Sequence, residues 1–129
     1  MAPRRLFLVT LFFATAFSAM ASAGELPTRV GACVVTTIAS IQTRLVDGDK
    51  PIPGSGSSVS FANGGYQVSY DTIPAIEQSR VGDHVRMCFL YAPTHCPKGD
   101  DRGKIYRTTN LRTKKSWRLP DSEHSCGGA

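Results

Sequence analysis

The segment "SVSFANGGYQVSY", Ser58 to Tyr70, decides the fold. Two runs of alternating polar and apolar residues flank Asn63, Gly64 and Gly65, which tolerate the positive φ angles of a tight turn. Alternation with a period of two is typical of strands that bury one face. The segment therefore predicts an antiparallel β-hairpin, to which the rest of the domain is expected to add strands.

Further strand signals lie on both sides of this hairpin. Four stretches are rich in β-branched residues or alternate strictly, namely residues 30–45, 84–91, 104–110 and 116–119. In the second stretch, the buried face is expected to consist of Val85, Met87, Phe89 and Tyr91. Residues 74–79 can form one helical turn at most. Five or six short strands without a long helix predict an all-β fold, a small antiparallel barrel of OB-like or SH3-like type, with a small β-sandwich as the alternative.

The N-terminal segment has the pattern of a secretory signal peptide. Two arginines precede an uncharged apolar run (residues 6–20), and the small-residue sequence ASA follows it. Residues 1–23 are therefore expected to be removed, which leaves one all-β domain over residues 24–129 with no transmembrane segment. The protein is expected to be periplasmic or secreted.

The cysteines support export. The mature chain keeps four, and an even number in a small exported protein predicts two disulfides with three possible connectivities. The segment "CFLYAPTHC" can fold back on itself, which would place Cys88 opposite Cys96. That pairing leaves Cys33 with Cys126 and is slightly favoured, and the other two connectivities remain open.

Five segments carry a resemblance to other proteins: "SGSSVSFANGGYQVSYD", "VGDHVRMC", "CPKGDDRG", "TTNLRT" and "LPDSEHSCGG". Through them the chain resembles a group of small exported bacterial proteins of uncharacterised activity. The resemblance covers nearly the whole mature chain. It implies export and a compact disulfide-stapled domain, and it assigns no activity and no site residues.

The strongest candidate for a binding surface is the basic stretch over residues 102–118. It holds seven basic residues and no acidic one, in a chain of 15 Lys and Arg against 10 Asp and Glu. Removing the two arginines of the signal peptide leaves 13 against 10, a net charge of +3. Basic and aromatic side chains on one face can bind anions. The predicted site consists of Lys104, Tyr106, Arg107, Arg112, Lys114, Lys115 and Trp117.

The expected partner of this stretch is an anionic envelope component or an acidic protein surface. Nucleic acid is not expected, because an exported protein meets little of it. The alternative is a solvated strand pair whose lysines discourage edge-to-edge aggregation. The predicted function is therefore that of an exported binding protein.

Catalysis and metal binding are the first competing class. Asp121, Ser122 and His124 have the residue types of a hydrolytic triad, but three groups within four positions of an extended tail cannot converge. His95 and His124 could join two cysteines around zinc, although export favours oxidised cysteines. The sequence indicates no cofactor and does not favour an enzyme.

Inhibition of an extracytoplasmic enzyme such as lysozyme is the second alternative. Exported bacterial β-barrels with disulfides include lysozyme inhibitors. The usual target enzyme is basic, however, and so is the best patch of this chain, so like charges would oppose docking.

Overall fold

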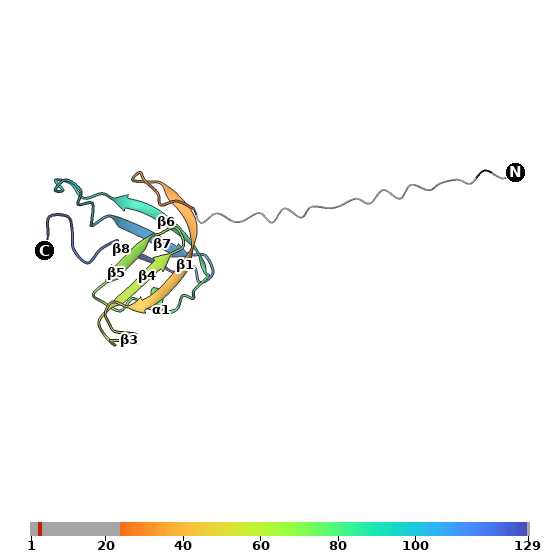
Figure 1. Ribbon diagram of the computed structural model, residues 1–129, viewed down its shortest axis with the longest axis horizontal. Helices are drawn as coiled ribbons and strands as arrows, with labels where there is room; N and C mark the ends of the chain where they lie inside the picture. Colours follow the sequence, from red (N-terminus) through yellow and green to blue (C-terminus); the bar gives the residue numbers. More distant parts are fainter. Residues whose placement is uncertain (1–2, 4–23, 129) are drawn as a thin grey trace.

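The computed structural model describes residue 3 and residues 24–128. The predicted signal peptide thus lies, except for Pro3, outside the described residues. The domain is a six-stranded antiparallel sheet that curls into a half-barrel (Figure 1). From edge to edge the strands are β5 (Tyr66–Ser69), β4 (Ser57–Phe61), β1 (Cys33–Thr43), β6 (His84–Tyr91), β7 (Ile105–Asn110) and β8 (Ser116–Pro120). The prediction of a small antiparallel barrel is confirmed.

Two small elements complete the fold. A hairpin of β2 (Val46–Asp47) and β3 (Lys50–Pro51) projects from the loop after β1. The helical turn α1 (Pro74–Glu77) begins with a proline, whose fixed φ suits the first position of a helix. Its Ile76 is fully buried and packs into the core.

β1 is the strand that curls the sheet. Its first half pairs with β6 and its second half with β4. The register with β4 shifts between Ile38 and Ser40, and irregularities of this kind bend a strand and increase its twist. The two halves of the sheet therefore curve toward each other around a core of Ile38, Val59, Phe61, Ile76, Val85, Met87, Phe89, Tyr106 and Trp117.

The predicted hairpin is present as β4 and β5. Gly64 takes a φ of 85°, and the side-chain oxygen of Asn63 accepts a hydrogen bond from the Gly65 amide at 3.0 Å. A second glycine is required just before β4. Gly56 has a φ of 117°, and a Cβ there would lie 2.0 Å from the carbonyl oxygen of Ser69. Two stretches of backbone pass each other at this point, so only glycine fits.

The expected buried face of β6 needs one correction. Val85, Met87 and Phe89 are buried, but Tyr91 is 46 % exposed. The pairing of β6 with β7 shifts between Phe89 and Tyr91, so the extra residue turns Tyr91 away from the core.

The two edges of the sheet, β5 and β8, meet through a side chain. Gln67 of β5 is fully buried. Its amide nitrogen donates hydrogen bonds to the carbonyl oxygens of Tyr106 at 2.8 Å and Leu119 at 3.0 Å. Its amide oxygen accepts from the Thr108 hydroxyl at 2.6 Å and from the Trp117 indole at 2.9 Å. One glutamine thus satisfies its whole hydrogen-bonding capacity while it closes the seam.

All four cysteines form disulfides, as predicted, but the favoured pairing is wrong. The bonds are Cys33–Cys88 and Cys96–Cys126. β1 and β6 are neighbours, and their register places Cys33 directly opposite Cys88, with 4.0 Å between the Cα atoms. In the chain-entropy description the two bonds contribute about 4 and about 3.5 kcal/mol to stability.

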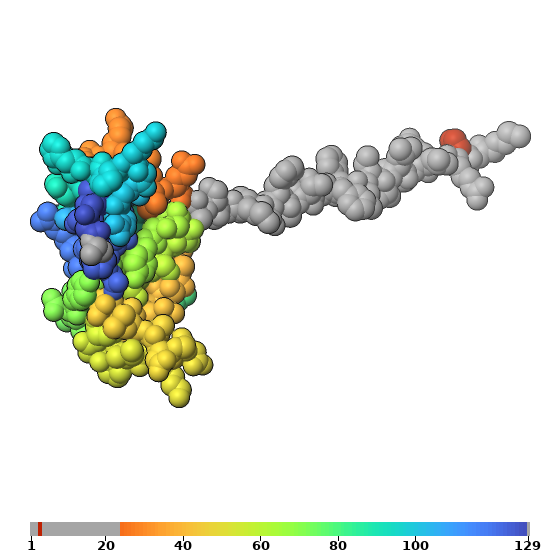
Figure 2. Space-filling view, turned by 60° about the vertical axis from the view of Figure 1, so that its left-hand side comes forward, coloured from red at the N-terminus to blue at the C-terminus, as the bar shows by residue number. Residues whose placement is uncertain are grey.

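The C-terminal tail is fastened to the loop between β6 and β7. Besides the Cys96–Cys126 bond, the Cys126 amide donates to the Arg102 carbonyl oxygen at 2.9 Å, and the Gly127 amide donates to the Asp100 carboxylate at 2.9 Å. Figure 2 shows this blue segment lying along the surface below the cyan loop. The tail is therefore an integral part of the domain.

Candidate functional site

Three arginines stand side by side on the outer side of the sheet, and we call them the arginine face: Arg86 of β6, Arg107 of β7 and Arg118 of β8. Arg107 lies directly opposite Arg118 in the β7–β8 ladder. Arg86 lies opposite Thr109, two positions along β7 from Arg107. All three are exposed, whereas their chain neighbours Val85, Met87, Tyr106, Thr108 and Trp117 point into the core.

Nothing in the described chain neutralises the arginine face. The strands β1, β6, β7 and β8 contain these three arginines and His84, and no aspartate or glutamate. None of the three arginines forms an ion pair with a residue in the described part of the chain. Like charges directly opposite each other in a sheet are destabilising. The fold therefore keeps an unfavourable pair that packing does not require.

The rest of this outer surface is mixed in character. The Arg118–Arg107 row continues into the Cys88–Cys33 disulfide, which links β6 to β1. The Arg86 row continues into Val35 of β1, whose side chain is 54 % exposed. This surface of arginine, disulfide and exposed aliphatic groups combines charge with apolar area.

The structure divides the seven predicted site residues into three groups. Arg107 lies in the arginine face, and Lys114 and Lys115 are exposed in the turn between β7 and β8. Lys104 and Arg112 are held by carboxylates, at 2.9 Å from Asp101 and 2.7 Å from Asp83. The prediction that the two aromatic residues lie on the binding surface is wrong: Tyr106 is 4 % and Trp117 5 % exposed.

Arg112 belongs to a structural network around Asp83. Its guanidinium contacts both carboxylate oxygens of Asp83, at 2.7 and 2.9 Å, and the Gln78 carbonyl oxygen at 3.2 Å. The buried Asn110 side chain donates to Asp83 and to the Ser79 hydroxyl, both at 2.8 Å. The hydrogen bonds from Arg112 and then Asn110 hold the pKa of Asp83 well below its usual value. This cluster ties the segment after α1 to the β7–β8 turn.

Arg86 and Arg118 are absent from the predicted site. Arg118 lies inside the basic stretch, and its alternation with Trp117 is the local signal for its outward direction. Arg86 lies far from that stretch in sequence, and only the pairing of β6 with β7 brings it beside Arg107. The alternation in residues 84–91 already directs Arg86 away from the core, so the missing information was the order of the strands.

The tail residues are not arranged for catalysis. The Ser122 hydroxyl donates to the backbone oxygen of His124 at 2.7 Å, so it is not directed at the imidazole. One carboxylate oxygen of Asp121 accepts hydrogen bonds from the backbone amides of Gly103 and Lys104. The side chains of Asp121 and Ser122 thus bind backbone groups, and no hydrogen bond in the described part of the chain joins the side chains of Asp121, Ser122 and His124 to one another.

The structure leaves no cysteine thiolates for the predicted zinc site around His95 and His124. Cys96 and Cys126, which adjoin His95 and His124 in the sequence, are joined in a disulfide and offer no thiolate. Within residues 24–128, no group of three or more His, Cys, Asp or Glu side chains is placed to hold a metal ion.

Comparison of the chain with known proteins finds no significant match. No protein-family model matches the chain, and no curated protein or solved structure shows significant similarity to it. Two disulfides indicate an oxidising environment outside the cytoplasm. Among the described residues, no helix has the length and apolar character needed to cross a membrane.

Proposed function

We propose that the protein is an exported binding protein, periplasmic or secreted, whose arginine face docks onto an acidic surface of a partner protein. The observation that carries the proposal is the register of Arg107 opposite Arg118, with Arg86 beside them and no carboxylate on the four strands. A carboxylate partner would remove the repulsion that the folded protein carries on its own.

The chemistry of the side chains favours carboxylates. Arginine presents a planar fork that can bind a carboxylate through two parallel hydrogen bonds, and it is enriched at protein interfaces. The exposed Val35 adjoins Arg86 and adds apolar contact area at the same surface. Lys114 and Lys115 extend the positive field from the adjoining turn and would accelerate the approach of an acidic partner.

The proposal is tested with a polyglutamate peptide of about 20 residues and a charge-matched pair of double variants. In Arg107→Glu/Arg118→Glu, two cations of the arginine face are reversed. In the control, Lys50→Glu/Lys98→Glu, two exposed lysines of the β2–β3 hairpin and the β6–β7 loop are reversed instead. Both variants change the net charge equally.

We expect the wild-type affinity to fall with added salt, because exposed charges are screened over about 10 Å at 0.1 M. The double variant of the arginine face should bind at least about tenfold more weakly than wild type, which corresponds to about 1.4 kcal/mol. The control should stay within about threefold. Equal losses in the two variants would show that net charge alone acts, and would refute the proposal. A parallel measurement on vesicles with anionic lipid decides against a protein partner if the vesicles alone bind.

A further inference from the structure

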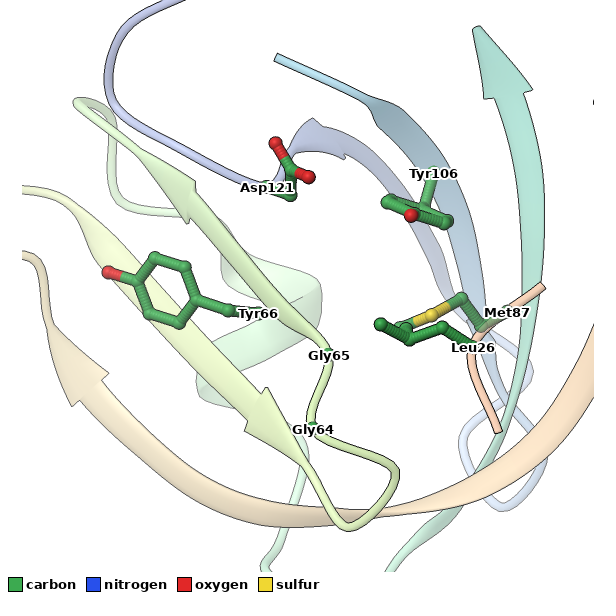
Figure 3. Close-up of a pocket in the computed structure, with 7 residues that line it drawn as sticks. All are labelled: Leu26, Gly64, Gly65, Tyr66, Met87, Tyr106 and Asp121. Carbon is green, nitrogen blue, oxygen red and sulfur yellow. The ribbon is translucent and has the colours of Figure 1, made fainter. Parts of the chain in front are cut away.

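A small hollow of about 140 Å³ opens on the inner side of the curled sheet, near its seam. Figure 3 shows the Leu26 and Met87 side chains pointing toward the Gly64–Gly65 turn, with Tyr106 and Asp121 on the other side of the opening. The walls are thus apolar on one side and polar on the other. The ring of Tyr66, whose residue also borders the hollow, is directed away from it.

The polar groups of the hollow have unused hydrogen-bonding capacity. Tyr106 borders the hollow, and its hydroxyl makes no hydrogen bond to another described residue. Burial, followed by the negative charge of Asp121, raises the pKa of Tyr106, so the hydroxyl stays protonated. A hydroxyl that borders a hollow and has no partner in the described protein can donate a hydrogen bond to a ligand there or accept one from it.

The Asp121 carboxylate is fixed in position, but only one of its two oxygens accepts hydrogen bonds from described residues. Its Oδ1 atom accepts hydrogen bonds from the Gly103 amide at 2.9 Å and the Lys104 amide at 3.1 Å, and its own amide donates to the Lys104 carbonyl oxygen. Its Oδ2 atom makes no hydrogen bond to another described residue. A carboxylate held in this way is preorganised, because its orientation is set before a ligand arrives.

The charges around the hollow favour a cation. The ammonium group of Lys104 is already held by Asp101, at 2.9 Å from the carboxylate and 3.1 Å from the carbonyl oxygen. Asp121 is the charged residue that borders the hollow, and it forms no ion pair with a described residue. A bound cation would neutralise its carboxylate.

We propose that this hollow binds a primary ammonium group on a short alkyl chain, with Asp121 and the Tyr106 hydroxyl contacting the nitrogen and Leu26 and Met87 contacting the methylenes. The hollow, at about 140 Å³, is well above the roughly 30 Å³ that one water takes in the liquid, so it has room for an ammonium group with several methylenes. A lysine side chain and a free butylammonium ion both have this size and chemistry. The site lies on the inner side of the sheet and is separate from the arginine face on its outer side.

The test is an NMR titration of the purified protein with n-butylammonium, following the amides of Gly64 and Gly65 and the methyl group of Met87. We expect saturable shifts with a Kd on the order of 1 mM, as suits a ligand of five heavy atoms. Neutral 1-butanol should bind at least about tenfold more weakly. Equal binding of the alcohol would overturn the assignment of an ammonium site.

Three variants separate the chemistry of the site from general effects. Asp121→Asn keeps an oxygen for the Gly103 and Lys104 amides and removes the charge, so the affinity should fall at least about tenfold. Tyr106→Phe should lower it by about three- to fivefold. The control Asp49→Asn removes an equal charge from the distant β2–β3 turn and should leave the affinity within about twofold. Equal effects of Asp121→Asn and Asp49→Asn would overturn the proposal.

Gly65→Ala provides a test that removes no polar group. A Cβ on Gly65 would lie 3.0 Å from Leu26 Cδ2 and 3.1 Å from Met87 Cε, so it would narrow the hollow, and it would also lie 3.0 Å from the Asn63 side-chain oxygen in the adjoining turn. Binding of n-butylammonium should be lost while the rest of the amide spectrum is retained, and retained binding would contradict the proposed location. A lysine-containing tripeptide, added in parallel, distinguishes the source: shifts with both ligands indicate a lysine side chain of a partner, and shifts with butylammonium alone indicate a free amine.

Discussion

The indole nitrogen of Trp117 donates a hydrogen bond to the side-chain oxygen of Gln67 at 2.9 Å, although the two residues lie 50 positions apart. Trp117 is on one edge strand of the sheet and Gln67 on the other. The barrel is thus closed at this point by side-chain chemistry, and both groups are buried.

Removal of this closure should be costly. In Gln67→Leu, the Trp117 indole and the Thr108 hydroxyl lose their acceptor, and one buried and one part-buried carbonyl oxygen lose a donor. An orphaned buried polar group costs about 1–3 kcal/mol, so we expect a loss of at least about 3 kcal/mol in the free energy of unfolding in urea. The control Gln42→Leu, at an exposed position of β1, should change it by less than about 0.5 kcal/mol. Similar values for the two variants would contradict the role assigned to Gln67.

Two glycines allow the cost of a steric collision to be distinguished from the cost of a positive φ angle in the free energy of unfolding. Gly54 and Gly56 both have positive φ, but a Cβ on Gly54 meets no atom within 4 Å, whereas one on Gly56 meets the Ser69 carbonyl oxygen at 2.0 Å. Gly54→Ala should therefore lower the free energy of unfolding by about 1 kcal/mol. Gly56→Ala should lower it by more than about 3 kcal/mol or prevent folding, because the chain must also move away from β5. Chemical unfolding followed by Trp117 fluorescence measures both, and an equal effect at the two positions would be evidence against the collision.

The network around Asp83 makes the free energy of unfolding depend on pH in the acidic range. Because the pKa of Asp83 in the folded protein lies below its unfolded value of about 3.9, the ionised carboxylate stabilises the fold above that pH. This contribution is lost as the pH falls through about 4 toward the lower folded pKa. The stability difference between wild type and Asp83→Asn should therefore shrink as the pH is lowered.

Urea unfolding at several values between pH 7 and pH 2 measures this difference. Arg112→Gln serves as a second variant, because it keeps the carboxyl group and removes the main cause of the lowered pKa. Its acid dependence should also be weaker than that of wild type. Parallel profiles for the three proteins would show that Asp83 is not coupled to folding.

Local patterns in the sequence were sufficient for the strands of the six-stranded sheet. The Asn63–Gly64–Gly65 turn and the alternation on both sides of it predicted the β4–β5 hairpin, and the other strands of that sheet followed from β-branched or alternating runs. The short β2–β3 hairpin was not predicted, because its segment is rich in turn residues. Tyr91 was misplaced because a register shift adds one residue without a trace in the local pattern.

Features that depend on the order of the strands in the sheet could not be predicted from short sequence segments. The partner of Cys33 is Cys88 because β1 and β6 are neighbours, a fact that no short segment contains. In residues 104–110 the inward positions alternate as Tyr106, Thr108 and Asn110, so two of the three buried residues are polar. Thr108 and Asn110 are tolerated inside because Gln67, Ser79 and Asp83 bind them from distant parts of the chain. The same non-local information was needed to bring Arg86 beside Arg107.

Closure through a single glutamine has a consequence for the hollows of this barrel. A ladder of backbone hydrogen bonds would join two edge strands along their full length, whereas the Gln67 side chain joins β5 to β8 at one point. The residues that precede and follow Gln67 in β5 border different hollows: Tyr66 borders the hollow that contains Asp121, and Val68 borders a second hollow with Ser69 and Leu119. Gln67 therefore fixes the strand from which both hollows take part of their walls.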